Sequence, residues 1–71
     1  MKMVTIKTEY IRLQDLLKLV NAVASGGEAK ERIQSGEATV NGEVCTQRGK
    51  KLRPGDQVVF EGAQYEVCNA N

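Results

Sequence analysis

The hydrophobic pattern of the chain changes its period near residue 13. Before that point Val4 and Ile6 alternate with Met3 and polar neighbours, and this period of two predicts a short strand. From Leu13 the apolar residues recur at the i, i+3, i+4 and i+7 positions of a helix with one apolar face. We expect this helix to end near Asn21, because Asn tolerates the left-handed conformation that often closes a helix. The expected apolar face consists of Leu13, Leu16, Leu17, Val20 and Ala24.

A second helix is predicted directly after the first. Ser25 and Glu28 have the spacing of a capping box, in which two side chains satisfy free N–H groups at the start of a helix. The helix would run over about residues 26–34, with Ala29 and Ile33 facing the core because they are four positions apart. Two helices joined by a tight turn form a helix-turn-helix-like pair.

The second half of the chain consists of short alternating segments between turn signals. Asn41-Gly42 is typical of a type I′ hairpin turn, Pro54-Gly55-Asp56 predicts another turn, and residues 61–64 predict a third. The expected strands cover residues 38–40, 43–45, 58–60 and 65–68. The order β-α-α-β-β-β-β predicts an α+β domain, in which the helix-turn-helix-like pair packs on a small, mostly antiparallel sheet.

The length and the charge distribution limit the organisation of the protein. A chain of 71 residues is expected to form a single domain over residues 1–71, since it cannot fill two cores. Ten basic and nine acidic residues leave a formal charge of only +1. However, residues 30–53 carry six basic and three acidic side chains, whereas residues 54–71 carry three acidic side chains and no basic ones. This asymmetry predicts a charged partner on one face.

The composition argues against several kinds of chemistry. The chain has no His and only two Cys, which excludes a conventional zinc site and a His-activated Ser or Cys nucleophile. No two carboxylates have a spacing that indicates an acid–base pair, so we expect no enzyme, no cofactor and no small-molecule substrate. The three aromatic residues, Tyr10, Phe60 and Tyr65, are too few for a base-stacking platform.

The sequence also favours a soluble, cytoplasmic protein. No segment approaches the roughly 20 apolar residues of a membrane span, so we expect no membrane partner. The N-terminal residues lack the apolar core and cleavage site of a signal peptide. In the absence of an export signal, Cys45 and Cys68 are expected to be reduced and largely buried.

The densest run of charge lies in residues 48–53, which we expect to form a polar loop. Arg48, Lys50, Lys51 and Arg53 occur there without an acidic neighbour. Such a run often forms a solvated face or protects an edge strand. Four cations within six residues nevertheless repel one another unless an anion meets them, which favours an anionic partner. Gly49 would allow the loop to bend toward that partner.

The ordered motifs of the chain resemble the RNA-binding domain named after ribosomal protein S-four, the alpha-L motif. The resemblance covers about residues 11–60, with Gly26 and Gln14 replacing the usual Arg and Asp. Its motifs are Arg12-Leu13, Leu16, Ser25, Ala29-Lys30, Ile33, Gly36, Val40-Asn41-Gly42, Gly55-Asp56 and Val58. Residues 25–30 and 48–52 are similar to those of stand-alone bacterial members, in which the domain is essentially the whole protein.

The resemblance implies a non-enzymatic protein that binds structured RNA. Ribosomal RNA would be its leading target, with a role in ribosome assembly or association with the ribosome, and a monomer is expected. The candidate RNA-binding residues are Lys18, Gly26, Gly27, Lys30, Arg32, Asn41, Arg48, Lys50, Lys51 and Arg53. A small protein-interaction adaptor, which would use the sheet or the acidic final third, is the alternative.

Physical chemistry gives each group of candidates both an RNA-binding and a structural interpretation. The start of the second helix offers N–H groups and a positive dipole end, and Gly26 and Gly27 leave room for a phosphate. Ser25 and Glu28 could equally form an ordinary capping box, and Asn41 could have only a structural role in the hairpin turn. Lys18 and Lys30 could be solvated helix lysines, and Arg32 stands where the family that the chain resembles often has an apolar residue.

Overall fold

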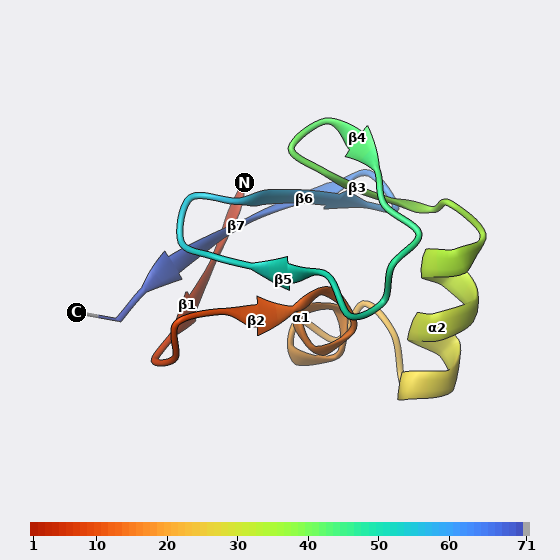
Figure 1. Ribbon diagram of the computed structural model, residues 1–71, viewed down its shortest axis with the longest axis horizontal. Helices are drawn as coiled ribbons and strands as arrows, with labels where there is room; N and C mark the ends of the chain where they lie inside the picture. Colours follow the sequence, from red (N-terminus) through yellow and green to blue (C-terminus); the bar gives the residue numbers. More distant parts are fainter. Residues whose placement is uncertain (71) are drawn as a thin grey trace.

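Two helices and seven short strands follow one another in the computed structural model, which describes residues 1–70 (Figure 1). The elements are β1 (Lys2–Ile6), β2 (Ile11–Arg12), α1 (Leu13–Leu19), α2 (Gly26–Gln34), β3 (Ala38–Val40), β4 (Glu43–Val44), β5 (Lys51–Leu52), β6 (Gln57–Phe60) and β7 (Ala63–Asn69). The expected α+β architecture is confirmed: both helices lie on one side of a small sheet (Figure 1).

The main sheet contains five strands in the order β1-β7-β6-β3-β4. Its pairings are antiparallel except for the parallel pairing of β1 with β7, so the sheet is mostly antiparallel as predicted. This parallel pair joins the two ends of the chain, with Lys2 opposite Tyr65 and Ile6 opposite Asn69. β1 therefore forms one edge of the main sheet.

A second, two-stranded sheet was not expected. β2 and β5 pair in antiparallel fashion, with Ile11 opposite Leu52 and Arg12 opposite Lys51. The prediction of a polar loop over residues 48–53 is therefore wrong at Lys51–Leu52, where Leu52 is fully buried. A two-residue strand is too short to show the alternation by which a strand is recognised in sequence.

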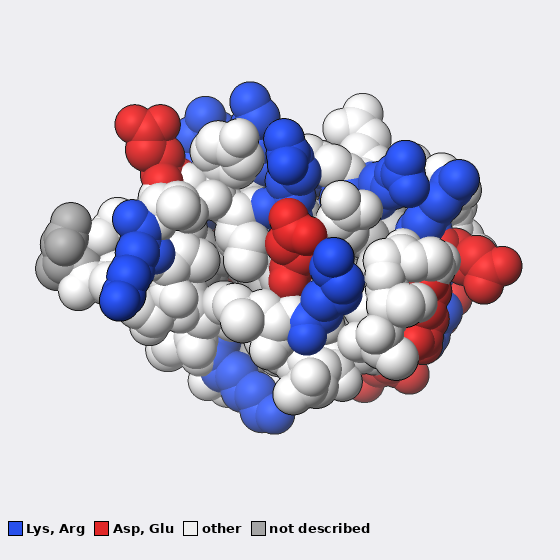
Figure 2. Space-filling view, turned by 90° about the horizontal axis from the view of Figure 1, so that it is seen from below, with Lys and Arg blue, Asp and Glu red and all other residues white. Residues whose placement is uncertain are grey.

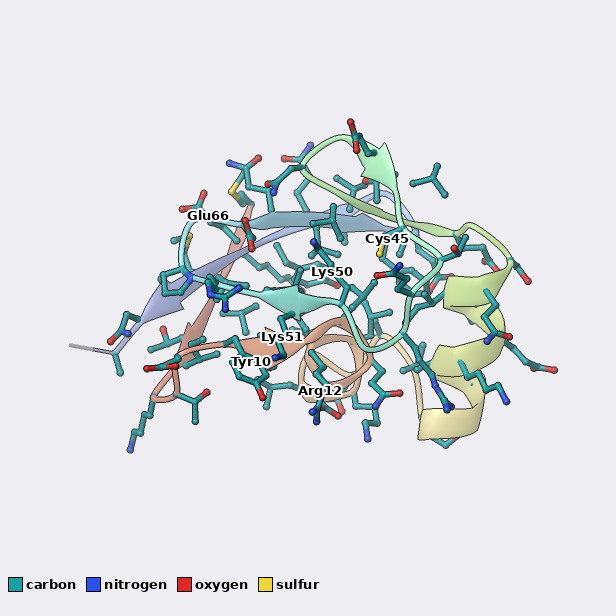
Figure 3. The ribbon with its side chains drawn as sticks, in the orientation of Figure 1. Tyr10, Arg12, Cys45, Lys50, Lys51 and Glu66 are labelled. Carbon is teal, nitrogen blue, oxygen red and sulfur yellow. The ribbon has the colours of Figure 1, made fainter. Side chains whose placement is uncertain are left out.

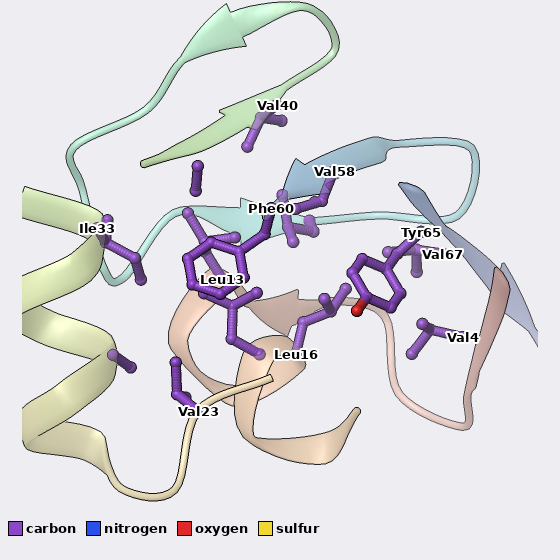
Figure 4. Close-up of a cluster of buried hydrophobic side chains, with 14 of the residues drawn as sticks. Val4, Leu13, Leu16, Val23, Ile33, Val40, Val58, Phe60, Tyr65 and Val67 are labelled. Atoms are coloured by element: carbon purple, nitrogen blue, oxygen red, sulfur yellow. The ribbon is translucent and has the colours of Figure 1, made fainter. Parts of the chain in front are cut away.

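The core lies between the helices and the inner face of the main sheet (Figure 4). Leu13, Leu16 and Leu17 of α1 are completely buried and belong to the same cluster as Phe60 and Val58 of β6. From α2, Ala29 and Ile33 face the core as expected. The alternating strands bury one side only, as the period of two requires.

The end of α1 differs in one detail from the predicted apolar face. The helix ends at Leu19, and Asn21 then adopts the left-handed conformation with φ of 60°. Because the chain turns there, Val23 reaches the core with 5% of its surface exposed, while Ala24 is exposed. Placing Ala24 on the apolar face was wrong, since helical spacing no longer applies beyond the turn.

The predicted hairpin turns are confirmed. Asn41 and Gly42 have φ values of 51° and 87°, the two positive angles that a type I′ turn requires. Glu61 and Gly62 repeat this geometry between β6 and β7 with φ values of 52° and 78°. Consequently β7 begins at Ala63, two residues earlier than expected.

The two cysteines are less buried than expected. Cys45 and Cys68 are free thiols, and both are half-buried rather than largely buried. Neither helix in the described part of the chain is long and apolar enough to cross a membrane.

Candidate nucleic-acid interface

The basic segment 48–53 is held against the start of α1 by backbone hydrogen bonds. The N–H of Leu13 donates to the carbonyl of Lys50 at 2.9 Å, and that of Gln14 donates to the carbonyl of Arg48 at 3.0 Å. These N–H groups have no partner within the helix, and Arg12 at the N-cap makes no side-chain capping bond. The segment thus acts as the cap of α1, which fixes the positions of Arg48 and Lys50.

The β2–β5 pairing brings two further cations together over an aromatic ring. Arg12 lies opposite Lys51 in the register, and both side chains approach Tyr10 (Figure 3). The Nζ of Lys51 is 4.9 Å and the Cζ of Arg12 is 6.0 Å from the ring centroid. The negative face of the ring offsets part of the repulsion between the cations. The structure therefore holds two positive charges side by side on an exposed surface.

Sequence reasoning did not include Tyr10 and Arg12 among the candidate residues. The Arg12-Leu13 pair was part of the recognised motif, so a signal for Arg12 existed. Tyr10 carried no such signal, because its role depends on β5, about 40 residues later in the chain.

The start of α2 forms a second part of the surface. The Oγ of Ser25 accepts the N–H of Glu28 at 3.2 Å, so Ser25 caps the helix as expected. The return bond of the expected capping box is displaced by one residue, because the Oε1 of Glu28 accepts the N–H of Ala24 at 2.8 Å and not that of Ser25. Lys18 forms an ion pair with Asp15 at 3.4 Å. Its Nζ would also lie 4.0 Å from a methyl group placed on Gly26, which brings Lys18 to the start of α2.

The two glycines at this helix start leave open space. Neither Gly26 nor Gly27 has a positive φ, and a Cβ on Gly27 would meet only the Oγ of Ser25, at 3.9 Å. Their backbone conformation therefore does not demand glycine. The absence of side chains gives a bulky anion access to the backbone N–H groups.

Positive charge gathers on the side of the molecule that is seen from below in Figure 2. Most of the acidic side chains in that view lie at its edges (Figure 2). Five candidates are exposed and have no ion-pair partner among residues 1–70: Lys30, Arg48, Lys50, Lys51 and Arg53. We call Arg12, Lys18, Arg48 and Lys51 the basic face, because α1, its N-cap and the segment that caps it carry them. The side chain of Lys50 lies on the other side of β5, toward the β3–β4 hairpin (Figure 3).

The side chain of Arg32, by contrast, is held by ion pairs within the protein. Its guanidinium pairs with Glu37 at 2.8 Å, Glu61 at 3.1 Å and Glu28 at 3.6 Å, and it lies 4.8 Å from the centroid of the Phe60 ring. The hydrogen bonds to Glu37 and then to Glu61 hold the pKa of Arg32 above its usual value. These contacts give Arg32 a structural role between α2 and the β6–β7 turn, and its contact with RNA stays a prediction.

The side chain of Asn41 is also occupied by the protein. Its Nδ2 donates to Asp56 Oδ1 at 3.0 Å, and its Oδ1 accepts the N–H of Gln57 at 2.9 Å. The other oxygen of Asp56 accepts the N–H of Arg53 at 2.8 Å. Asp56 thus joins the β3–β4 hairpin to the end of the basic segment. Direct contact of Asn41 with RNA stays a prediction.

The same bonds determine the ionisation of Asp56. Partial burial raises its pKa, but the hydrogen bonds from Arg53 and Asn41 and the charges of Lys50 and Arg53 outweigh that effect. The pKa of Asp56 in the folded protein is consequently lower than its ordinary value of 3.8. Its negative charge therefore stabilises the fold at neutral pH.

Replacement of Asp56 by Asn should reduce stability in a pH-dependent way. Because the folded pKa is depressed, the contribution of the carboxylate is fully present above pH of about 4 and is lost as the pH falls through the folded value. Urea unfolding of wild type and D56N at pH 7 and pH 3 measures this contribution. The two proteins should differ most at pH 7, and an equal difference at both pH values would contradict the assigned role.

Among the described residues, no group of three or more His, Cys, Asp or Glu side chains is arranged to hold a metal ion. The chemistry that residues 1–70 place on this surface consists of fixed cations, backbone N–H groups and one aromatic ring. These groups suit the binding of a polyanion.

Comparison with known proteins identifies the family. The model of the S4 domain family matches residues 4–68. The chain belongs to the S4 domain family. The motif resemblance over about residues 11–60 is thereby confirmed, and the family match extends beyond it into β1 and β7.

Relatives of similar length support this assignment. RlbA of Bacillus subtilis (strain 168), named as a probable ribosome maturation protein, is 42% identical over 67 residues, which cover 93% of this chain and 94% of RlbA. YbcJ of Escherichia coli (strain K12), named as a candidate RNA-binding protein, is 38% identical over 61 residues, covering 86% of this chain and 87% of YbcJ. Neither relative is named for a catalytic activity.

The fold is also that of a solved S4-type structure. The solution structure of E. coli YbcJ matches with a TM-score of 0.72 and 35% identity, covering 96% of this chain and 87% of that one. It is described as revealing an alpha-L motif involved in RNA binding. This similarity confirms the predicted arrangement of a helix pair on a mostly antiparallel sheet.

Proposed function

We propose that this S4 domain protein binds structured RNA, with ribosomal RNA as the target, through the basic face, and that it does so without catalysing a reaction. The observation that carries the proposal is the rigid cap of α1. It presents Lys51 beside Arg12, Arg48 at the start of α1, and Lys50 on the other side of β5, and the side chains of these four residues have no ion-pair partner among residues 1–70. The names of the relatives, which refer to RNA binding and ribosome maturation, support the same function.

The arrangement favours folded RNA over a flexible single strand. Phe60 and Tyr65 are buried, and the ring of Tyr10 is approached by two cations, so a row of free stacking rings is absent from the described surface. Double-helical RNA is recognised by its shape, its phosphates and its 2′-hydroxyls. Cations on a fixed scaffold suit that type of recognition, because little side-chain and loop entropy is lost on binding.

The start of α2 and the remaining candidates extend this proposed surface. Lys18, Gly26 and Gly27 would meet one phosphate, and Lys30 and Arg53 would contact the backbone at either side. The proposal includes a role in ribosome assembly or maturation in the cytoplasm. A protein-interaction adaptor without RNA contact is the competing class.

Crosslinking in living cells, followed by sequencing of the attached RNA, tests the proposal. The expected result is a focused peak on one helix of ribosomal RNA. Crosslinks spread evenly over abundant RNAs would contradict a specific target and leave only electrostatic affinity. Absence of crosslinks above background would contradict RNA binding altogether and favour the adaptor.

A further inference from the structure

A hollow of about 470 Å³ opens beside the basic face, between the β3–β4 hairpin and residues 45–50. Cys45 and Lys50, which belong to its lining, lie between the hairpin and β5 in Figure 3. Its volume falls within the range of about 300–1,000 Å³ that is typical of small-ligand sites. Lys50, one of the candidate RNA-binding residues, belongs to its lining.

The walls of the hollow are held in place before any ligand binds. The N–H of Cys45 donates to the carbonyl of Ala38 at 3.0 Å, and the Sγ of Cys45 contacts the carbonyl of Gln47 at 3.6 Å. On the other side the N–H of Lys50 donates to the carbonyl of Gln47 at 3.1 Å. A preformed site loses little entropy on binding, which favours occupancy by a single rigid group.

The lining suits a nucleobase better than a phosphate. Val44, with 63% of its surface exposed, provides an apolar wall, while Thr46 and Gln47 provide hydrogen-bonding groups. Glu43 also lines the hollow, and its carboxylate would repel a phosphate but can accept a hydrogen bond from an amino group of a base. Lys50 adds one positive charge to the lining, where it can meet the backbone of the same nucleotide.

We propose that this hollow receives one unpaired nucleotide that is turned out of a helical RNA, while the basic face holds the phosphates of the adjoining stem. Proteins achieve sequence-specific recognition of RNA mostly at loops and bulges, whose bases are free to enter pockets. This inference rests on the proposed RNA-binding function and adds the structural element that the RNA must contain.

Three RNA hairpins with one common stem test the inference on the full chain. The first is fully paired, the second has one bulged nucleotide, and the third has an abasic residue at the bulge position. Wild type should bind the bulged hairpin about tenfold more tightly than the other two, which corresponds to about 1.4 kcal/mol for one base contact. The abasic hairpin separates recognition of the base from the flexibility that any bulge confers.

A variant that fills the hollow provides an independent readout. Thr46 is exposed and lines the hollow, so Thr46→Trp should remove the preference for the bulge while keeping the affinity for the paired hairpin. Gln64→Trp, at an exposed position on the other side of β7 from the core, is the matched control and should behave as wild type.

The outcomes distinguish this inference from the proposed function. Equal binding of all three hairpins by wild type, or a bulge preference that Thr46→Trp retains, would overturn the nucleotide site and leave RNA binding intact. Failure of wild type to bind any hairpin would overturn both. The comparison of hairpins with wild type is valid even if Thr46→Trp fails to fold.

Discussion

Removal of the charges of Arg48, Lys50 and Lys51 together should flatten the salt dependence of RNA binding. Each lysine or arginine that contacts a phosphate adds close to one unit to the slope of log K against log salt concentration. The triple alanine variant should therefore lose about two to three units of slope and bind more weakly at every salt concentration. Titration of a ribosomal RNA fragment at several salt concentrations measures this slope.

The structure indicates that the triple variant will fold. The three side chains are exposed, and the bonds that cap α1 use the backbone carbonyls of Arg48 and Lys50, which alanine retains. A Lys2→Ala, Lys7→Ala double variant removes exposed charge at and after the edge strand β1, and its slope should change by less than about one unit. An unchanged slope in the triple variant would exclude this segment from the interface.

Replacement of Leu17 by Ala should cause a large loss of stability. Leu17 is completely buried in the core between α1 and the sheet, and truncation of such a residue costs about 2–5 kcal/mol. Native proteins have a total stability of about 5–15 kcal/mol, so the variant would lose a substantial part of it. Urea unfolding followed by circular dichroism measures the change in the free energy of unfolding.

Leu19 offers a control within the same helix. It has 58% of its surface exposed, so Leu19→Ala should change the stability by no more than about 0.5 kcal/mol. Where Leu17→Ala is still folded, it should keep the wild-type salt slope for RNA, because the basic face is unchanged. If the two substitutions cost the same, the assignment of Leu17 to the core would be wrong.

The sequence predicted most of the basic residues of the candidate site, but not their geometry. The run of four cations in residues 48–53 was visible, but their geometry depends on the bonds from Leu13 and Gln14 to that segment. Arg32 had the same appearance in sequence as the other cations. Two of its carboxylate partners, Glu28 and Glu37, lie within five residues of it, whereas Glu61 reaches it only through the tertiary fold.

Features that depend on near neighbours were determined by the sequence itself. The N-cap at Ser25, the left-handed Asn21 and the turn at Asn41-Gly42 each depend on interactions within a few residues, and all three were predicted correctly. The order of the motifs was sufficient to indicate the family. Such signals are readable because local backbone preferences and short hydrogen bonds act before long-range contacts form.

The tertiary structure determined which residues far apart in the sequence become neighbours. It paired β1 with β7 across more than 60 residues, joined β2 to β5, and placed Tyr10 and Arg12 beside Lys51. A strand of two residues shows no periodicity from which it could be recognised in the sequence. The position of β5 is set by the burial of Leu52 in the same core as Phe60. The surface that we propose for RNA therefore results from packing, because burial of apolar side chains determines which charged residues become neighbours.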